Sequence, residues 1–242
     1  DLQNNTPIVV KAPRAETMQT NLAVKRFVDE VRSVVALRHP HIVPITDVGI
    51  HDDLPYAVMP LLTGGNLQGR WPTDAKGVRQ PMRPDTLGTW LPGVAAALDW
   101  IHSKGFVHRD VKPGNVMFNA YGQAFLGDFG VAKAFRQDEE IEFQERYAQT
   151  STGMIIGTSE YMSPEGVFGE PHDGRSDQYA LAVMVFEALT GRRPFIGPTG
   201  VAVMLQHSAA VPPSVLEFQP DLPVEVADAV NRALSKRPED RF

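Results

Sequence analysis

Four polar side chains between residues 106 and 130 have the types and the spacing that phosphate chemistry requires. Asp110, Lys112, Asn115 and Asp128 lie in the stretch FVHRDVKPGNVMFNAYGQAFLGDFG, on loops beside predicted strands. A rigid scaffold can aim such loop residues at one point. Carboxylate and amide oxygens are ligands that Mg²⁺ accepts beside a triphosphate, and an ammonium group can neutralise charge on a phosphoryl group in transfer. Side chains of these types could serve phosphoryl transfer, although each of them alone is commonplace.

Two short motifs carry these residues. Residues 108–110 read His-Arg-Asp and, with Asn115, fit H-R-D-x-x-x-x-N, while residues 128–130 read Asp-Phe-Gly and follow a predicted hairpin. Each tripeptide by itself is most often a turn or a surface loop. In this order and at this spacing, the two motifs resemble the catalytic and metal-binding loops of eukaryotic-type protein kinases.

The resemblance implies two cofactors, ATP and Mg²⁺, with Mn²⁺ as an alternative cation. It also implies a role for each polar residue. Asn115 and Asp128 would hold the metal ion against the phosphates. Asp110 would orient the attacking hydroxyl and accept its proton, and Lys112 would neutralise charge that develops on the transferred group.

A lysine inside an apolar strand fits the same reading. Lys11 ends the run Ile-Val-Val-Lys within a strand predicted at residues 8–12, and it resembles the lysine that contacts the α and β phosphates in kinases. Such a lysine needs an acidic partner on the helix that follows, which we predict at residues 21–37. Glu30 has apolar residues three positions before and four positions after it, so it should face the apolar side, where a lysine partner offsets its burial.

The stretch GTSEYMSPE at residues 157–165 resembles the end of a kinase activation segment, with Ser-Pro-Glu where the family most often has Ala-Pro-Glu. The resemblance implies that Thr158 bridges Asp110 and Lys112, as in Ser/Thr kinases rather than Tyr kinases. It also implies that Glu165 pairs with Arg241. The sequences of these stretches most resemble those of bacterial eukaryotic-like Ser/Thr kinases. The expected partners are therefore ATP and proteins with Ser or Thr hydroxyls.

Regulation is expected from the same comparison. Arg109 stands next to the catalytic aspartate, as in kinases that are switched by phosphorylation of the activation loop, and Thr150 and Thr152 match the sites that bacterial kinases use. Self-association would allow such autophosphorylation. Phe129 belongs to the apolar column that couples the two lobes, and Asp177, at the start of a central helix, would steady the catalytic loop.

The predicted fold is α+β and bilobal, with a small β-rich N-lobe at residues 1–59, a hinge at 60–65 and a larger, mainly helical C-lobe at 66–242. The hinge would bind adenine through Pro60 and Leu62, with Met59 as gatekeeper and Pro60 offering only its carbonyl. Further elements follow from apolar spacing and turn residues: strands at 42–50 and 56–59, a helix at 87–101 kinked by Pro92, a hairpin of strands 116–118 and 124–126, and helices at 176–189 and 224–234.

Composition excludes several classes of protein. The chain has 242 residues, 43% of them hydrophobic, a net charge of −6 and no cysteine. The charge argues against a nucleic-acid binder, and the lack of cysteine excludes disulfides and thiolate metal sites. The most apolar stretch, residues 179–189, is too short to span a bilayer. We therefore expect a cytoplasmic location, with any membrane anchor outside this segment.

Two alternatives to a protein kinase remain open. A pseudokinase would bind nucleotide or a partner without transferring a phosphoryl group, and it is favoured by one absence: ten residues precede Lys11, and none is the glycine of a Gly-rich phosphate loop. Either that loop was cropped or this chain lacks it. A small-molecule kinase of the aminoglycoside phosphotransferase type shares the loops, but Arg109 and Glu165 argue against it.

Overall fold

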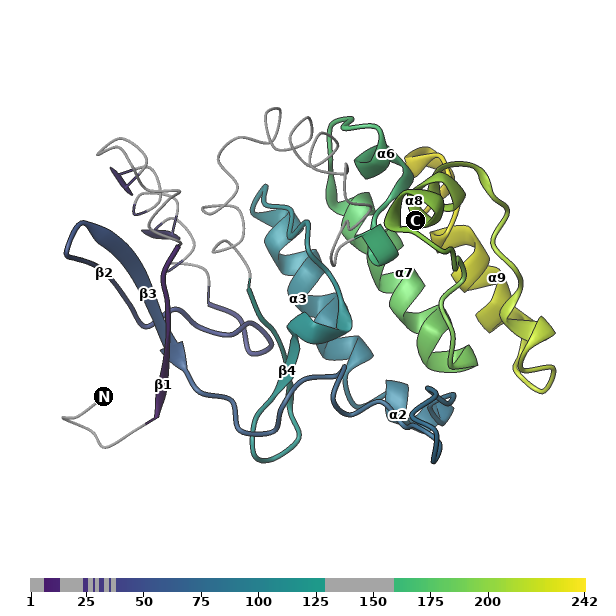
Figure 1. The fold of residues 1–242 in the computed structure, drawn as a ribbon, viewed down its shortest axis with the longest axis horizontal. Helices are drawn as coiled ribbons and strands as arrows, with labels where there is room; N and C mark the ends of the chain where they lie inside the picture. Colours follow the sequence, from purple (N-terminus) through teal and green to yellow (C-terminus); the bar gives the residue numbers. More distant parts are fainter. Residues whose placement is uncertain are drawn as a thin grey trace.

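The computed structural model describes residues 7–13, 38–128 and 159–242, together with Val24, Lys25, Val28, Val31, Arg32 and Val35, which are helical. A small sheet lies at one end of the molecule and a set of helices at the other (Figure 1). This arrangement confirms the predicted α+β class.

The small sheet is antiparallel and has the order β1-β3-β2, with β1 at Ile8–Lys11, β2 at Asp47–His51 and β3 at Leu54–Pro60. Alternate residues of β3 are buried, and Ala57 and Met59 pack with Val28 and Val31 of the preceding helix. The strand that we predicted at 8–12 is confirmed. The strand predicted at 42–50 is shorter in the structure and begins at Asp47. Ile42 forms only an isolated bridge with Leu126, and residues 43–46 lie outside any strand.

The helix predicted at 87–101 is two helices in the structure. A short helix, α2, covers Pro84–Leu87, and α3 covers Leu91–Ser103. Pro92 therefore lies in the first turn of α3. Backbone N–H groups in the first turn make no hydrogen bond within the helix, so proline costs none there, and the kink that we predicted does not occur.

The hairpin follows α3 and is confirmed. Strand β4 at Val116–Phe118 pairs antiparallel with β5 at Ala124–Leu126. Gly122 has φ +80° in the turn between them, a conformation that favours glycine. A 3₁₀ turn, η2 at Pro113–Asn115, leads directly into β4, so the motif residues lie immediately before and after this hairpin.

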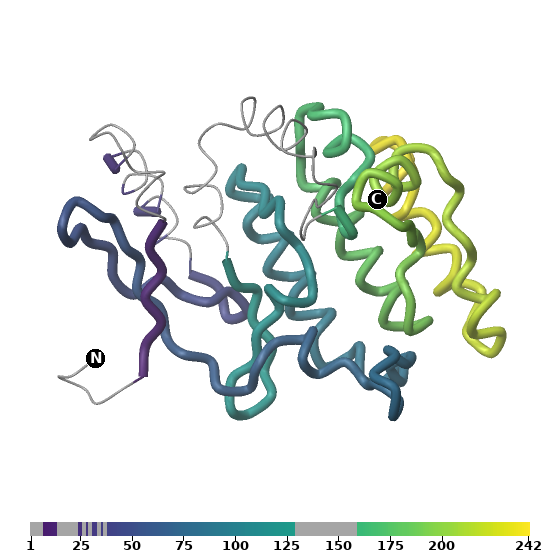
Figure 2. Tube along the Cα trace, viewed as in Figure 1, coloured from purple at the N-terminus to yellow at the C-terminus, as the bar shows by residue number. Residues whose placement is uncertain are grey.

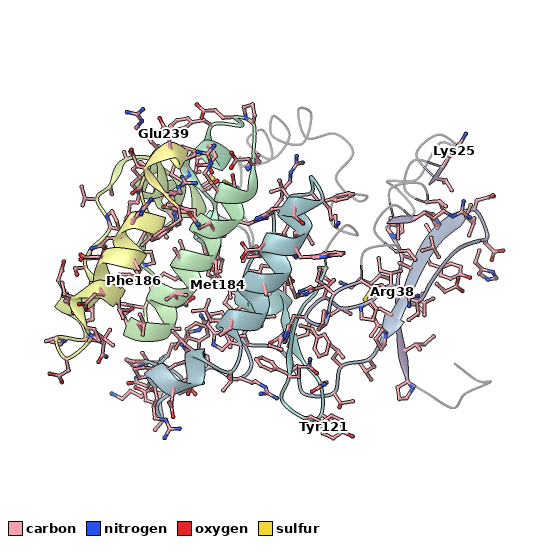
Figure 3. The ribbon with its side chains drawn as sticks, turned by 180° about the vertical axis from the view of Figure 1, so that it is seen from behind. Lys25, Arg38, Tyr121, Met184, Phe186 and Glu239 are labelled. Atoms are coloured by element: carbon pink, nitrogen blue, oxygen red, sulfur yellow. The ribbon has the colours of Figure 1, made fainter. Side chains whose placement is uncertain are left out.

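The helical part is built around α7, at Gly174–Thr190, which ends at Gly191 in the left-handed conformation. Its Met184 and Phe186 lie inside the helical part, whereas Tyr121 lies at the hairpin turn (Figure 3). Helix α9, at Val224–Ala233, confirms the last predicted helix. The shorter elements are η4 at Ser159–Tyr161, α6 at Pro164–Val167, η5 at Val215–Glu217 and η6 at Pro238–Asp240.

Helix α8, at Gly200–Ala209, was not predicted, because the prolines on either side of it, such as Pro198 and Pro212, made the whole segment read as a connection. It lies beyond α7 on the side away from the small sheet (Figure 2). In the described part of the chain, no helix is both long enough and apolar enough to cross a membrane.

Candidate active site

The loop before β4 brings three of the predicted site residues together. The Lys112 ammonium lies 2.8 Å from Asp110 Oδ2, and Asn115 Nδ2 donates to the same oxygen at 2.9 Å and to the Asp110 carbonyl at 2.7 Å. Asp110 and Asn115 are buried, so these contacts form where water competes little. The loop thus presents a carboxylate, an amide and a cation at one place.

Asp128 joins this group to the small sheet. It follows β5, and its carboxylate accepts a hydrogen bond from the Lys11 ammonium at the end of β1, an ion pair between residues that are far apart in the sequence. Its φ of +63° is in the left-handed region, which costs an L-residue about 1–2 kcal/mol. Such backbone strain concentrates at functional sites.

Helix α7 holds the backbone of the loop at residues 108–110. One Asp177 carboxylate accepts hydrogen bonds from the backbone N–H of His108, at 2.7 Å, and of Arg109, at 2.8 Å. Arg109 has φ +64°, so the two bonds help to hold a strained backbone. The His108 ring also donates from Nε2 to the Gly127 carbonyl at 3.0 Å, which ties this loop to the residue before Asp128.

The oxygen atoms at this site fit a magnesium ion only in combination with a nucleotide. Among the residues that the structure describes, no group of three His, Cys, Asp or Glu side chains could hold a metal. Asn115 uses its amide nitrogen on Asp110, which leaves its amide oxygen for a cation, and Asp128 offers a carboxylate. Two protein oxygens leave most of the six positions around Mg²⁺ for phosphate oxygens and water.

The segment after β3 lies where we predicted the adenine contacts. Met59 is buried at the end of the sheet and pairs with Val9 of β1. The N–H of Leu61 donates to the Pro7 carbonyl at 3.4 Å, and Pro60 has no N–H. The contacts of the Pro60 carbonyl and the Leu62 backbone with adenine stay predictions.

Glu165 and Arg241 meet inside the helical part, as the family resemblance implies. The guanidinium donates from Nη1 to Oε1 and from Nη2 to Oε2, both at 2.8 Å, and the Ser176 hydroxyl donates to Oε1 at 2.6 Å. Burial alone would raise the pKa of Glu165, but the hydrogen bonds from Arg241 and Ser176 lower it to about 2. The contact therefore fixes the end of the 157–165 stretch to the last residues of the chain.

Glu187 is a buried carboxylate for which the sequence predicted no role. Glu187 accepts a hydrogen bond from the Tyr161 hydroxyl at 2.7 Å and pairs with Arg79, which lies far away in the sequence. Burial raises the pKa of Glu187, and the arginine opposes that shift. The sequence did hold a signal, namely an acidic residue inside the most apolar stretch of the chain.

Glu30, Phe129, Thr150, Thr152 and Thr158 lie outside the residues that the structure describes. Their assigned roles, including the pairing of Glu30 with the strand lysine, stay predictions.

The comparisons with known proteins agree on one family. The family model described as "Protein kinase domain" matches residues 1–242. The Ser/Thr protein kinase PknB of Mycobacterium leprae is 34% identical over 248 residues, which cover 100% of this chain and 38% of that protein. PknB of Mycolicibacterium smegmatis is 35% identical, with 100% of this chain and 37% of the relative covered. The chain thus spans less than half the length of the relatives that it matches.

Solved structures show the same fold. The crystal structure of the PknI kinase domain of Mycobacterium tuberculosis has a TM-score of 0.67 to this chain at 27% identity. The match covers 97% of this chain and 80% of the PknI chain.

Proposed function

Because this chain belongs to the protein kinase family, we propose that it transfers the γ-phosphoryl group of ATP to Ser or Thr hydroxyls of proteins. The observation that carries the proposal is the meeting of Asp110, Lys112 and Asn115 in one hydrogen-bonded group, with Asp128 tied to Lys11 across the two parts of the molecule. All five residues have the types that this reaction needs.

The arrangement suggests how each side chain acts. Asp110 orients the attacking hydroxyl and accepts its proton, while Lys112, already beside that carboxylate, neutralises charge on the transferred group. Lys11 contacts the phosphates of the nucleotide. Asn115 and Asp128 would hold Mg²⁺, and the bound ion would neutralise charge at the phosphate oxygens.

Radiolabelled ATP and dephosphorylated casein test the proposal, with Asp110→Asn compared against Asp99→Asn, an exposed aspartate on α3. We expect incorporation by the native chain and by Asp99→Asn, and a loss of at least about a hundredfold in Asp110→Asn. Nucleotide binding without any incorporation by the native chain would contradict the proposal and favour a pseudokinase. Phosphorylation of an aminoglycoside but not of casein would favour the small-molecule alternative.

We also propose that autophosphorylation at Thr150 and Thr152 activates the enzyme. Arg109, beside the catalytic aspartate, is the group that could pair with a phosphate. Mass spectrometry after incubation with ATP should find phosphate at these threonines, and the rate should rise with protein concentration if one copy modifies another. Full activity of the Thr150→Ala, Thr152→Ala double variant would exclude the activating role.

A further inference from the structure

Residues 41–43 run alongside the β4–β5 hairpin. The Leu126 N–H donates to the His41 carbonyl at 2.7 Å, and the Val43 N–H donates to the Leu126 carbonyl at 2.9 Å. Ile42 pairs with Leu126 in a parallel bridge, and both of these side chains are buried. Strand β5 therefore lies between β4 on one side and this segment on the other.

The 41–43 segment connects the two parts of the molecule. In the sequence it comes after Val31, which packs on the small sheet, and before β2. In space the chain runs here from the small sheet to the hairpin and back (Figure 1, Figure 2). Ile42 belongs to the large hydrophobic core of the helical part. The segment thus ties the small sheet to β5.

The side chain of His41 adds a contact at the start of β5. Its Nδ1 lies 2.8 Å from the Ala124 carbonyl oxygen, and because a carbonyl oxygen can only accept, Nδ1 carries the proton. Ala124 is buried, so water does not readily replace this donor. His41 therefore holds β5 through its ring at Ala124 and through its backbone at Leu126.

Helix α3 leaves a place for this ring. It lies against Gly93, where an added Cβ would come within 2.6 Å of Nδ1 and 2.9 Å of Cγ, so a side chain at this position would push the ring away from Ala124. The backbone of His41 is also fixed, because its N–H donates to His39 Nδ1 at 3.2 Å. The His39 ring packs against Trp100 of α3, with a centroid distance of 5.7 Å.

Strand β5 leads directly to a proposed metal ligand. Gly127 follows the strand, and its N–H donates to the Asn115 carbonyl at 2.7 Å while its carbonyl accepts from His108. Asp128 comes next and pairs with Lys11 of the small sheet. The position of β5 thus sets where the Asp128 carboxylate stands relative to Asn115.

We propose that His41 is a positioning residue for Asp128: through its contact with the Ala124 carbonyl, it fixes β5 so that the Asp128 carboxylate can share a metal ion with Asn115. This inference rests on the proposed function, which makes both residues ligands of Mg²⁺ beside the nucleotide. It requires that loss of the Nδ1–H contact weakens binding of nucleotide with Mg²⁺ more than binding of nucleotide alone.

Two substitutions at residue 41 test the contact. In His41→Asn, the amide nitrogen takes the place of Nδ1 and can donate to Ala124, whereas His41→Leu fills a similar space without a donor. With a fluorescent ATP analogue and Mg²⁺, we expect about tenfold weaker binding by His41→Leu, because a smaller fraction of the molecules then has the binding-competent arrangement. In EDTA the difference should be less than about twofold, and His41→Asn should bind within about twofold of the native chain in both conditions.

The effect should pass through Asp128. When His41→Leu is added to Asp128→Asn, it should weaken binding with Mg²⁺ by less than about twofold, because the two changes act on the same group. Without any ligand, amide hydrogen exchange at Leu126 should be faster in His41→Leu than in the native chain. Gly93→Ala should give the same results from the side of α3, and it takes the place of His41→Leu if that variant fails to fold.

A matched control makes the outcome decisive. His51→Leu is the same substitution at an exposed histidine of β2, and it should change none of these measurements. Equal weakening with Mg²⁺ and with EDTA in His41→Leu, or unchanged binding in both, overturns the inference alone. If Mg²⁺ does not strengthen nucleotide binding by the native chain, the metal site in the proposed function fails and the inference fails with it. Casein phosphorylation by the native chain decides the proposed transfer separately.

Discussion

Arg241 and Glu165 form a bidentate ion pair in the interior of the helical part, in which each carboxylate oxygen lies 2.8 Å from a guanidinium nitrogen. Both side chains are buried. The pair joins α6 to the last residues of the chain, two stretches that are far apart in the sequence.

Arg241→Ala should destabilise the protein strongly, because it leaves the Glu165 carboxylate buried without its partner. Loss of one member of a buried pair typically costs about 3–5 kcal/mol. Urea unfolding followed by circular dichroism measures the change. Arg237→Ala is the matched control: it removes an arginine from the exposed pair with Glu239, and it should change the free energy of unfolding by about 0.5 kcal/mol or less. Similar losses in the two variants would contradict the prediction.

His207 should contribute a loss of stability as pH decreases below 6.5. Burial, together with the positive charges of Lys236 and Arg193, lowers its pKa from 6.5 to about 3 in the folded protein, so in that window the unfolded chain binds a proton that the native protein does not. The free energy of unfolding then decreases with falling pH, by at most about 1.4 kcal/mol per pH unit for this group.

His207→Gln, which does not titrate, should lose less stability than the native chain between pH 6.5 and 4.5. That range lies above the pH window from 4.5 to about 2, in which Glu165 is protonated in the unfolded chain but still ionised in the folded one. Urea unfolding at several pH values measures the slope. His51→Gln, at an exposed histidine, should behave like the native chain, and equal slopes for His207→Gln and the native chain would refute the assignment.

Asp177→Asn should reduce turnover more than nucleotide affinity. The carboxylate accepts from the N–H of His108 and of Arg109, and an amide at this position offers only one accepting oxygen, which leaves one buried N–H without its acceptor. We expect kcat to fall about tenfold or more, since the loss of a buried partner costs about 1–3 kcal/mol and here it loosens the catalytic loop. Casein phosphorylation and binding of a fluorescent ATP analogue measure the two effects. Equal losses in kcat and in affinity would argue against loop support.

Asp128→Asn should raise the Mg²⁺ concentration that half-saturates casein phosphorylation, because one of the two protein oxygens proposed for the cation loses its charge. Titration of Mg²⁺ at fixed ATP measures this, and removal of the metal by EDTA should abolish transfer. Asp85→Asn, at an exposed aspartate of α2, serves as the control. An unchanged Mg²⁺ dependence in Asp128→Asn would remove this residue from the metal site.

Much of the candidate site could be predicted from sequence, because its residues sit in short motifs next to strands with clear local signals. The loop at residues 108–115 and the turn after β5 are close in sequence to the hairpin that orients them, and β1 is marked by its β-branched residues. The pairing of Glu165 with Arg241 was accessible only through the family resemblance, since no local pattern relates positions so far apart.

The sequence by itself therefore determined the motif residues, the protein kinase fold that they imply and the elements that flank them. Only the tertiary structure decided that Pro92 lies in the first turn of a helix instead of bending one, that Glu187 pairs with Arg79, and that His207 joins α7 and α8 to η4. The physical reason is the same in each case. Whether a proline, a carboxylate or an imidazole is tolerated in the interior depends on which hydrogen-bond partners the folded chain brings to it.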